Sequence, residues 1–67
     1  MIKVYTTPTC VYCHALMDWL DESGIEYKEI DARNVEGISA VPVVEIGSKK
    51  IVGFDRRAIK KALKELN

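Results

Sequence analysis

The chain has 67 residues, of which 48% are hydrophobic and 30% charged, and its ten basic residues balance its ten acidic ones. A chain of this length forms one domain, residues 1–67, and buries only about 60% of the surface that its unfolded form exposes. Because the net charge is zero and no apolar run approaches the ~20 residues of a membrane span, we expect neither a nucleic-acid nor a membrane partner.

The first two predicted elements are a strand over residues 2–6 and the helix that follows it. The strand residues alternate with a period of two and are rich in β-branched and aromatic side chains. Thr9 is suited to cap the helix, and Gly24 suits its left-handed C-terminal cap. Apolar residues recur in the helix at i, i+3, i+4 and i+7, which predicts a stripe that faces the core: Cys13, Leu16, Met17 and Leu20.

The next predicted element is a second strand over residues 25–30. One helix joins it to the first strand, so the two strands should be parallel with a right-handed crossover. Residues 31–40 are expected to form a loop or at most one helical turn. They lead to Pro42, which excludes a helix at that point.

The last predicted elements are a hairpin and a helix. Residues 43–46 and 50–52 are the two strands of the hairpin, which turns at Gly47-Ser48 and ends at Gly53. Asp55 is a good N-cap for the helix, whose apolar stripe is formed by Ile59, Ala62, Leu63 and Leu66.

The two cysteines of the chain, Cys10 and Cys13, lie at the junction of the first strand and the first helix. A Cys-x-x-Cys pair in that context is typical of a redox dithiol. One helical turn places positions i and i+3 on the same face, so the two sulfurs can join and part. The unpaired N–H groups and partial positive charge of the helix start favour the thiolate form of Cys10. We therefore expect Cys10 to be exposed and attacking, and Cys13 to be shielded and resolving.

Two other interpretations of the cysteine pair compete with the redox one. A permanent disulfide would close a tiny loop, and because stabilisation grows with loop length it would contribute little to the fold. A zinc site formed by Cys10, Cys13 and His14 lacks a fourth ligand and a second Cys/His pair. We therefore expect no metal in the monomer, and a cluster shared between two chains remains the alternative.

Three stretches of the chain, taken with the order of its elements, resemble the glutaredoxin branch of the thioredoxin fold. They are YTTPTCVYCH at residues 5–14, AVPVV at residues 40–44 and VGFD at residues 52–55. The resemblance implies an α/β fold with a four-stranded mixed sheet, built as β-α-β and then β-β-α. It points to small bacterial and archaeal glutaredoxin-like proteins, including redoxins that supply electrons to ribonucleotide reductase.

The resemblance also implies roles for residues outside the cysteine pair. Pro42 would adopt the cis form and face the disulfide, and the backbone of Val41 would hydrogen-bond a bound thiol peptide. Gly53 and Asp55 would hold the γ-glutamyl end of glutathione, and the side chain of Tyr12 would form one wall of the site. The resemblance implies no tightly bound cofactor, and glutathione would act as a co-substrate.

The chain departs from the family pattern at the position of the family's glutathione-binding lysine, where it has Thr7. The positive charge for the glycine carboxylate of glutathione would then come from Arg33, Arg56 or Arg57. The alternative is that a thioredoxin-reductase-like flavoprotein reduces the chain in place of glutathione.

A second departure is the stretch 31–42, which is too short for the helix that relatives place there. We expect the middle helix to be reduced or absent, so that one sheet face is largely bare. If Ile2 and Val4 face the helices, Lys3 and Tyr5 point to that bare face. Such a face should be partly polar, with an apolar patch of Val43, Tyr5 and Ile30 that could support self-association.

Three further side chains near the cysteine pair have less specific predictions. We expect His14 to be a half-exposed helix residue rather than a group that tunes Cys10. Trp19 should pack against neighbouring elements rather than stack on a substrate. Tyr12 lies between the cysteines at a helix start, so it should be exposed and touch the substrate.

The predicted function is thiol–disulfide exchange on protein or glutathione mixed disulfides. Clients would be disulfide-containing proteins, among which the resemblance suggests ribonucleotide reductase, and the electron donor would be glutathione or a flavoprotein. The alternative is a binding module in which two chains bridge an iron–sulfur cluster through Cys10 and glutathione. The sequence starts at Met1 without a basic and apolar leader, so we expect a cytoplasmic protein, either a monomer or a weak homodimer.

Overall fold

The computed structural model describes residues 2–38 and 40–66, and of Leu66 the backbone only. The side chain of Leu66 in the predicted stripe therefore lies outside the described residues. The elements follow one another as β1 (Ile2–Thr6), α1 (Val11–Glu22), β2 (Lys28–Asp31), the single 3-10 turn η1 (Ala32–Asn34), β3 (Val43–Ile46), β4 (Lys49–Val52) and α2 (Arg56–Leu66).

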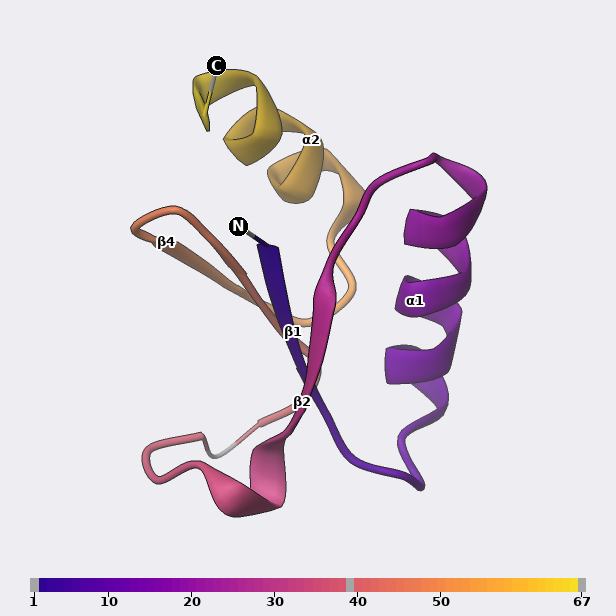
Figure 1. Cartoon of the computed structure of the whole chain (residues 1–67), viewed down its shortest axis with the longest axis vertical. Helices are drawn as coiled ribbons and strands as arrows, with labels where there is room; N and C mark the ends of the chain where they lie inside the picture. Colours follow the sequence, from indigo (N-terminus) through magenta and orange to yellow (C-terminus); the bar gives the residue numbers. More distant parts are fainter. Residues whose placement is uncertain (1, 39, 67) are drawn as a thin grey trace.

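The four strands form one mixed sheet in the order β2-β1-β3-β4. β1 is parallel to β2, as one crossover helix requires, while β3 is antiparallel to both β1 and β4. The end of β1, the start of β3 and the end of β4 therefore meet at one end of the sheet. Helix α1 begins beside that end, where the chain leaves β1 (Figure 1). The predicted fold class, β-α-β followed by β-β-α with the middle helix reduced to one turn, is confirmed.

The core lies between α1, α2 and one face of the sheet. Its buried side chains come from both helices and from alternate strand positions: Ile2, Val4, Leu16, Leu20, Val44, Ile46, Ile59 and Ala62. This set confirms that Ile2 and Val4 face the helices. Trp19 and Phe54 close the core at its edge, with their ring centroids 6.1 Å apart and their planes tilted by 55°.

The N-cap of α1 is Cys10 and not Thr9, so the predicted cap was wrong. A turn that starts at Thr7 places Thr9 before the helix, because the N–H of Cys10 donates to the carbonyl of Thr7 at 3.2 Å. Cys10 has extended backbone angles, and its carbonyl accepts the first helical hydrogen bond, from the N–H of His14. The helix start is thus one residue later than the threonine suggested.

The end of α1 explains why β2 is shorter than predicted. Gly24 has φ +72°, and the N–H groups of Gly24 and Ile25 donate to the carbonyls of Asp21 and Leu20, which is a Schellman motif. The N–H of Ile25 is therefore used by the helix cap, and pairing with β1 begins only at Lys28. The predicted strand over residues 25–30 was wrong at its start, whereas β4 begins one residue earlier than predicted, at Lys49.

The sheet face opposite the helices is covered in part, so the predicted exposed apolar patch was wrong. Tyr5 and Val43 are only 9% and 5% exposed, and they pack with Ala32 of η1. Partly buried apolar side chains surround them, from β2 and from the segment that follows it: Ile30, Val35, Ile38 and Val41. A segment too short for a helix still folds back over the apolar row of the sheet, and in Figure 1 it lies on the side of β2 away from α1.

The other half of that sheet face is polar, as predicted. The register aligns Lys28, Lys3, Glu45 and Lys50 in one row across the four strands. Lys3 and Lys50 lie 3.9 and 4.0 Å from the carboxylate of Glu45. In the part of the chain that the structure describes, neither helix has the length and apolar character needed to cross a membrane.

Candidate active site

The sulfur of Cys10 lies at the N-terminus of α1 and caps it. It accepts a hydrogen bond from the backbone N–H of Cys13 at 3.2 Å, and the residue is half-buried. A sulfur in this position satisfies one of the unpaired N–H groups of the first turn and lies at the positive end of the helix dipole. Both features stabilise negative charge on sulfur.

Cys13, one helical turn along, has no exposed surface and belongs to the buried side of α1. Burial, and then the hydrogen bond with Cys10, raise the pKa of its thiol to about 11. At neutral pH Cys13 is therefore a neutral thiol that contacts the sulfur of Cys10. The two predicted residues are brought together with the expected difference in exposure.

Pro42 lies at the same end of the sheet, and the Val41–Pro42 peptide bond is cis, as the resemblance implied. The register pairs Tyr5 with Val43, which places Pro42 beside the end of β1, where the chain turns toward Cys10. Gly53, which follows β4, lies at this end of the sheet as well, because its N–H donates to the carbonyl of Pro42 at 2.7 Å. Gly53 has φ +91°, a conformation that L side chains rarely adopt.

The other predicted site residues differ in how much of each is available to a ligand. Tyr12 is 69% exposed between the two cysteines, and its neighbour Val11 is 77% exposed. Val41 is half-buried and packs against the cluster of Tyr5, Ala32 and Val43. The carboxylate of Asp55 accepts a hydrogen bond from the N–H of Ala58 at 3.1 Å and thus caps α2, as predicted.

The arginines considered as anion ligands are engaged to different degrees. Arg33 pairs with Asp31, at 2.7 Å from Nη2 to Oδ2 and with a second contact through Nε. The guanidinium of Arg56 lies over the ring of Phe54, 5.4 Å from its centroid. A crevice of about 200 Å³ separates the Thr7 turn from Arg33 and the segment that leads to Val41.

A hydrogen bond between the buried Thr6 and the exposed Glu29 was missed by the sequence analysis. Thr6 is 3% exposed, and its hydroxyl donates to Oε2 of Glu29 at 2.8 Å. The negative charge of Glu29 is one of the causes that raise the pKa of Cys13. The signal was present, because the alternation of residues 25–30 places Glu29 on the apolar side, where a carboxylate is unexpected.

Two neighbouring side chains have structural roles. Nε2 of His14 lies 3.2 Å from the carbonyl oxygen of Pro8, so the exposed imidazole ties α1 to the preceding turn. Trp19 packs against Phe54, as predicted. Among residues 2–38 and 40–66, no group of three or more His, Cys, Asp or Glu side chains is arranged to hold a metal ion.

Comparisons with known proteins agree on one family. The model of the glutaredoxin family matches residues 2–40. An uncharacterized glutaredoxin-like 8.6 kDa protein from the rubredoxin operon of Clostridium pasteurianum is 31% identical over 75 residues, which cover 97% of this chain and 100% of that protein. The Gene 56 protein of Mycobacterium phage D29 is 38% identical over 53 residues, which cover 64% of this chain and 59% of that protein.

Solved structures show the same likeness. The glutaredoxin-like NrdH-redoxin of Escherichia coli, described as having a thioredoxin-like activity profile, matches with a TM-score of 0.77 and 28% identity over 90% of this chain and 91% of its own. Buckwheat glutaredoxin, solved in complex with glutathione, matches with a TM-score of 0.71 and 26% identity over 97% of this chain and 71% of its own. Both matches extend over at least 90% of this chain and show the same overall fold.

Proposed function

The chain belongs to the glutaredoxin family of redox proteins, and from that premise we propose that it is a thiol–disulfide oxidoreductase that acts through Cys10 and Cys13. The observation that carries the proposal is the contrast between the two sulfurs. The sulfur of Cys10 accepts the N–H of Cys13 at a helix N-terminus, whereas Cys13 is enclosed and its pKa is raised to about 11. The Cys10 sulfur is positioned for the first attack, and the Cys13 thiol stays protonated until the second step.

The first step is the attack of the Cys10 thiolate on a substrate disulfide. A bond forms between the Cys10 sulfur and one substrate sulfur, the substrate S–S bond breaks, and the other substrate sulfur leaves as a thiolate that takes up a proton. The hydrogen bond from the N–H of Cys13 holds the attacking sulfur in place. The exposed Tyr12 and the half-buried Val41 and Gly53, which lie beside the buried Pro42, are the surfaces against which the substrate would lie.

The second step releases the substrate. The Cys13 thiol gives up its proton, and its sulfur attacks Cys10, which expels the second substrate sulfur as a thiolate that takes up a proton. The substrate has then gained two electrons and two protons, and the chain holds a Cys10–Cys13 disulfide. The hydrogen bond to Cys10 raises the pKa of Cys13, and it is lost once the Cys10 sulfur is bonded to substrate, so this change favours the second step.

A two-electron donor must reduce the disulfide of the chain. We favour a thioredoxin-reductase-like flavoprotein over glutathione, because Thr7 replaces the lysine of the family pattern and Asp31 already engages Arg33. The likeness to NrdH-redoxin, with its thioredoxin-like activity profile, supports the same choice. Oxidised chain should therefore recover its thiols faster with NADPH and such a reductase than with glutathione.

Serine substitutions of the two cysteines test the assignment. Cys10→Ser should abolish reduction of a small uncharged disulfide, because no attacking sulfur remains. Cys13→Ser should still form the mixed disulfide and should trap it, which mass spectrometry detects. Ala15→Ser adds a hydroxyl to an exposed position of the same helix and should leave turnover unchanged. Turnover by Cys10→Ser would show that the roles are wrongly assigned.

A further inference from the structure

The zero net charge of the chain conceals a strong separation of charge. Residues 1–31 contain six acidic and two basic residues, for a net charge of −4, whereas residues 32–67 contain four acidic and eight basic residues, for a net charge of +4. The fold converts this sequence division into a spatial one. α1 leads into β2 at one edge of the sheet, and α2 packs against β3 and β4 toward the opposite edge.

The positive side is formed by five exposed residues on α2, which we call the basic stripe: Arg56, Arg57, Lys60, Lys61 and Lys64. Together they line a shallow hollow of about 460 Å³. Within the described part of the chain, none of the five has a carboxylate within 4 Å, whereas nearby Lys49 pairs with Glu65. The five charges thus face solvent.

The charges of the basic stripe are unfavourable for helix formation. The first turn of α2 contains two arginines and no acidic residue, against the helix dipole. Arg56–Lys60, Arg57–Lys61 and Lys60–Lys64 are pairs of like charge four residues apart, and each such pair destabilises a helix. Arg56 is compensated in part by its contact with the ring of Phe54, whereas no ion pair compensates the stripe among the described residues. Charges that break local rules without a compensating ion pair are expected where a surface has a function.

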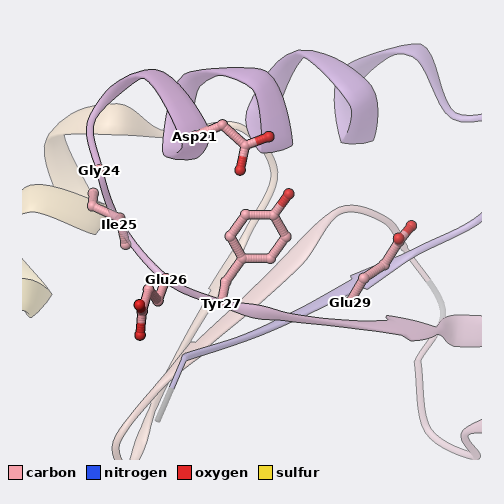
Figure 2. Close-up of a pocket in the computed structure, with 6 residues that line it drawn as sticks. All are labelled: Asp21, Gly24, Ile25, Glu26, Tyr27 and Glu29. Carbon is pink, nitrogen blue, oxygen red and sulfur yellow. The ribbon is translucent and has the colours of Figure 1, made fainter.

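The negative side, which we call the acidic edge, lies between the end of α1 and the segment that leads into β2. It consists of Asp18, Asp21, Glu22, Glu26 and Glu29, all exposed. Figure 2 shows the hydroxyl of Tyr27 directed toward Asp21, with Glu29 farther along the strand. Burial and then the charge of Asp21 raise the pKa of Tyr27. The hydroxyl of Tyr27 therefore stays uncharged at neutral pH and adds no charge to the acidic edge.

The basic stripe begins at the active-site end of the sheet. Arg56 is four residues beyond Val52, which ends β4 opposite Val43 and next to Pro42. From Arg56 to Lys64 the helix rises by about 12 Å at 1.5 Å per residue. This span is close to the Debye length of about 10 Å at 0.1 M salt, so the five charges act together on an approaching partner.

From these observations we infer that the basic stripe of α2 is the docking surface for an acidic protein partner, which it orients toward the active-site end of the sheet. The inference rests on the proposed function, since the partner would be a disulfide-carrying client or the reductase. The acidic edge repels the same partner at the opposite side. Docking is thereby biased to one face of a chain that carries no net charge.

An acidic protein surface fits this charge pattern better than a nucleic acid does. The molecule measures only 30 × 24 × 17 Å, so a long polyanion on the basic stripe would also meet the field of the acidic edge. A protein patch of limited size can contact the stripe alone. The ring nearest the stripe, Phe54, is partly buried and has the guanidinium of Arg56 over it. The exposed Tyr12 lies at the cysteine pair and not on α2, so the stripe offers no free ring for base stacking.

Binding can be measured without any redox chemistry. A cysteine-free peptide of twelve Asp and Glu residues is titrated into the reduced chain, and backbone amide shifts are followed by NMR. The largest shifts should lie at residues 56–64 and should vanish in 1 M salt, where the Debye length is about 3 Å. Shifts spread evenly over the chain, or shifts that salt does not change, would overturn the inference. A duplex oligonucleotide that binds residues 56–64 more tightly than the peptide would also overturn it.

A kinetic experiment connects the surface to catalysis. The substrate is the acidic peptide with a disulfide at one end, since twelve extended residues reach about 40 Å and exceed the longest dimension of the molecule. Lys60→Gln with Lys64→Gln should lower kcat/KM for this substrate about three- to tenfold, because each exposed ion pair is worth ~0.2–1 kcal/mol. Turnover of a small uncharged disulfide should not change.

The matched control neutralises two lysines on the other sheet face, Lys3→Gln with Lys28→Gln, and gives the same net charge. Its kcat/KM for the acidic peptide should stay within twofold of the parent. Equal losses in both double variants would show that net charge alone matters and would refute a docking surface. If the parent chain turned over neither substrate, the proposed function would be refuted. The NMR titration would still show whether the basic stripe binds an acidic peptide.

Discussion

Cys13 is a thiol that the fold keeps neutral. Burial and the hydrogen bond to Cys10 raise its pKa from 9.0 to about 11. In the unfolded chain this thiol is free to ionise near its ordinary value, so the folded state binds one more proton than the unfolded state between pH 9 and 11. The enclosed sulfur therefore links the stability of the chain to pH in the alkaline range.

The expected result is a loss of stability as the pH rises from 9 through 11. The stabilising contribution of the neutral Cys13 thiol is fully present below pH 9 and is lost as the pH passes the folded-state value of about 11. Urea unfolding of the reduced chain at pH 7.5, 9 and 10.5 measures the slope. Cys13→Ala should flatten it, and Tyr27→Phe removes the contribution of the other group whose pKa is raised. A parent chain with the same slope as Cys13→Ala would contradict the assignment.

Glu29→Gln should lower the pKa of Cys13. The carboxylate of Glu29 disfavours the thiolate, and glutamine removes the charge but can still accept the hydroxyl of Thr6. The pH dependence of the Cys13 Cβ chemical shift measures the change, and trapped mixed disulfides should resolve faster. Glu26→Gln is the control, because Glu26 is exposed and is not among the causes of the Cys13 shift. An unchanged titration of Cys13 in Glu29→Gln would refute this coupling.

At the scale of elements, the starts of both helices depend on single side chains that also belong to the candidate site. Cys10 caps α1 through its sulfur, and Asp55 caps α2 through its carboxylate. A cap satisfies an N–H group that the helix itself leaves unpaired. In the proposed function such residues would contribute to both stability and activity, and the two contributions need separate tests.

Asp55 allows that separation. Asp55→Ala should destabilise the chain by about 1 kcal/mol through loss of the cap, whereas Asp55→Asn keeps a capping oxygen and should be nearly as stable as the parent. Urea unfolding measures both. If Asp55→Asn is stable but slower with glutathione, the negative charge has a binding role as well. An alanine variant as stable as the parent would show that the observed hydrogen bond contributes nothing to α2.

At the scale of the whole molecule, the segment after β2 covers part of the sheet face opposite the helices, in place of a helix on that face. Val35 and Ile38 flank the buried cluster of Tyr5, Ala32 and Val43 on the face away from the helices. A short irregular segment can cover this small apolar row, while the polar row beside it needs no cover. The apolar side chains that could promote self-association are thereby shielded in the folded chain.

Removal of this cover should expose the sheet face. Val35→Ser with Ile38→Ser should leave Tyr5 and Val43 accessible, so that the variant associates as its concentration rises. Sedimentation should show a monomer for the parent and larger species for the variant. Glu36→Ser, an exposed change in the same segment, should behave as the parent does. A parent chain that dimerises as readily as the double variant would contradict the shielding of the cluster.

The sequence by itself determined the features that local patterns encode. The alternation of Ile2 to Thr6, the 3.6-residue stripe through Leu16 and Leu20, and the positions of Gly24 and Asp55 set the order and polarity of the elements. The two cysteines one turn apart indicated the chemistry that is proposed for the chain. These features depend on neighbours along the chain, which the sequence displays directly.

Only the tertiary structure decided the features that depend on distant neighbours. It moved the helix cap from Thr9 to Cys10, joined Thr6 to Glu29, and laid the segment after β2 over Tyr5. It also separated opposite charges onto two edges of one sheet, although their sum along the chain is zero. Burial and electrostatic fields arise from how elements pack in space, and for that reason no local pattern displays them.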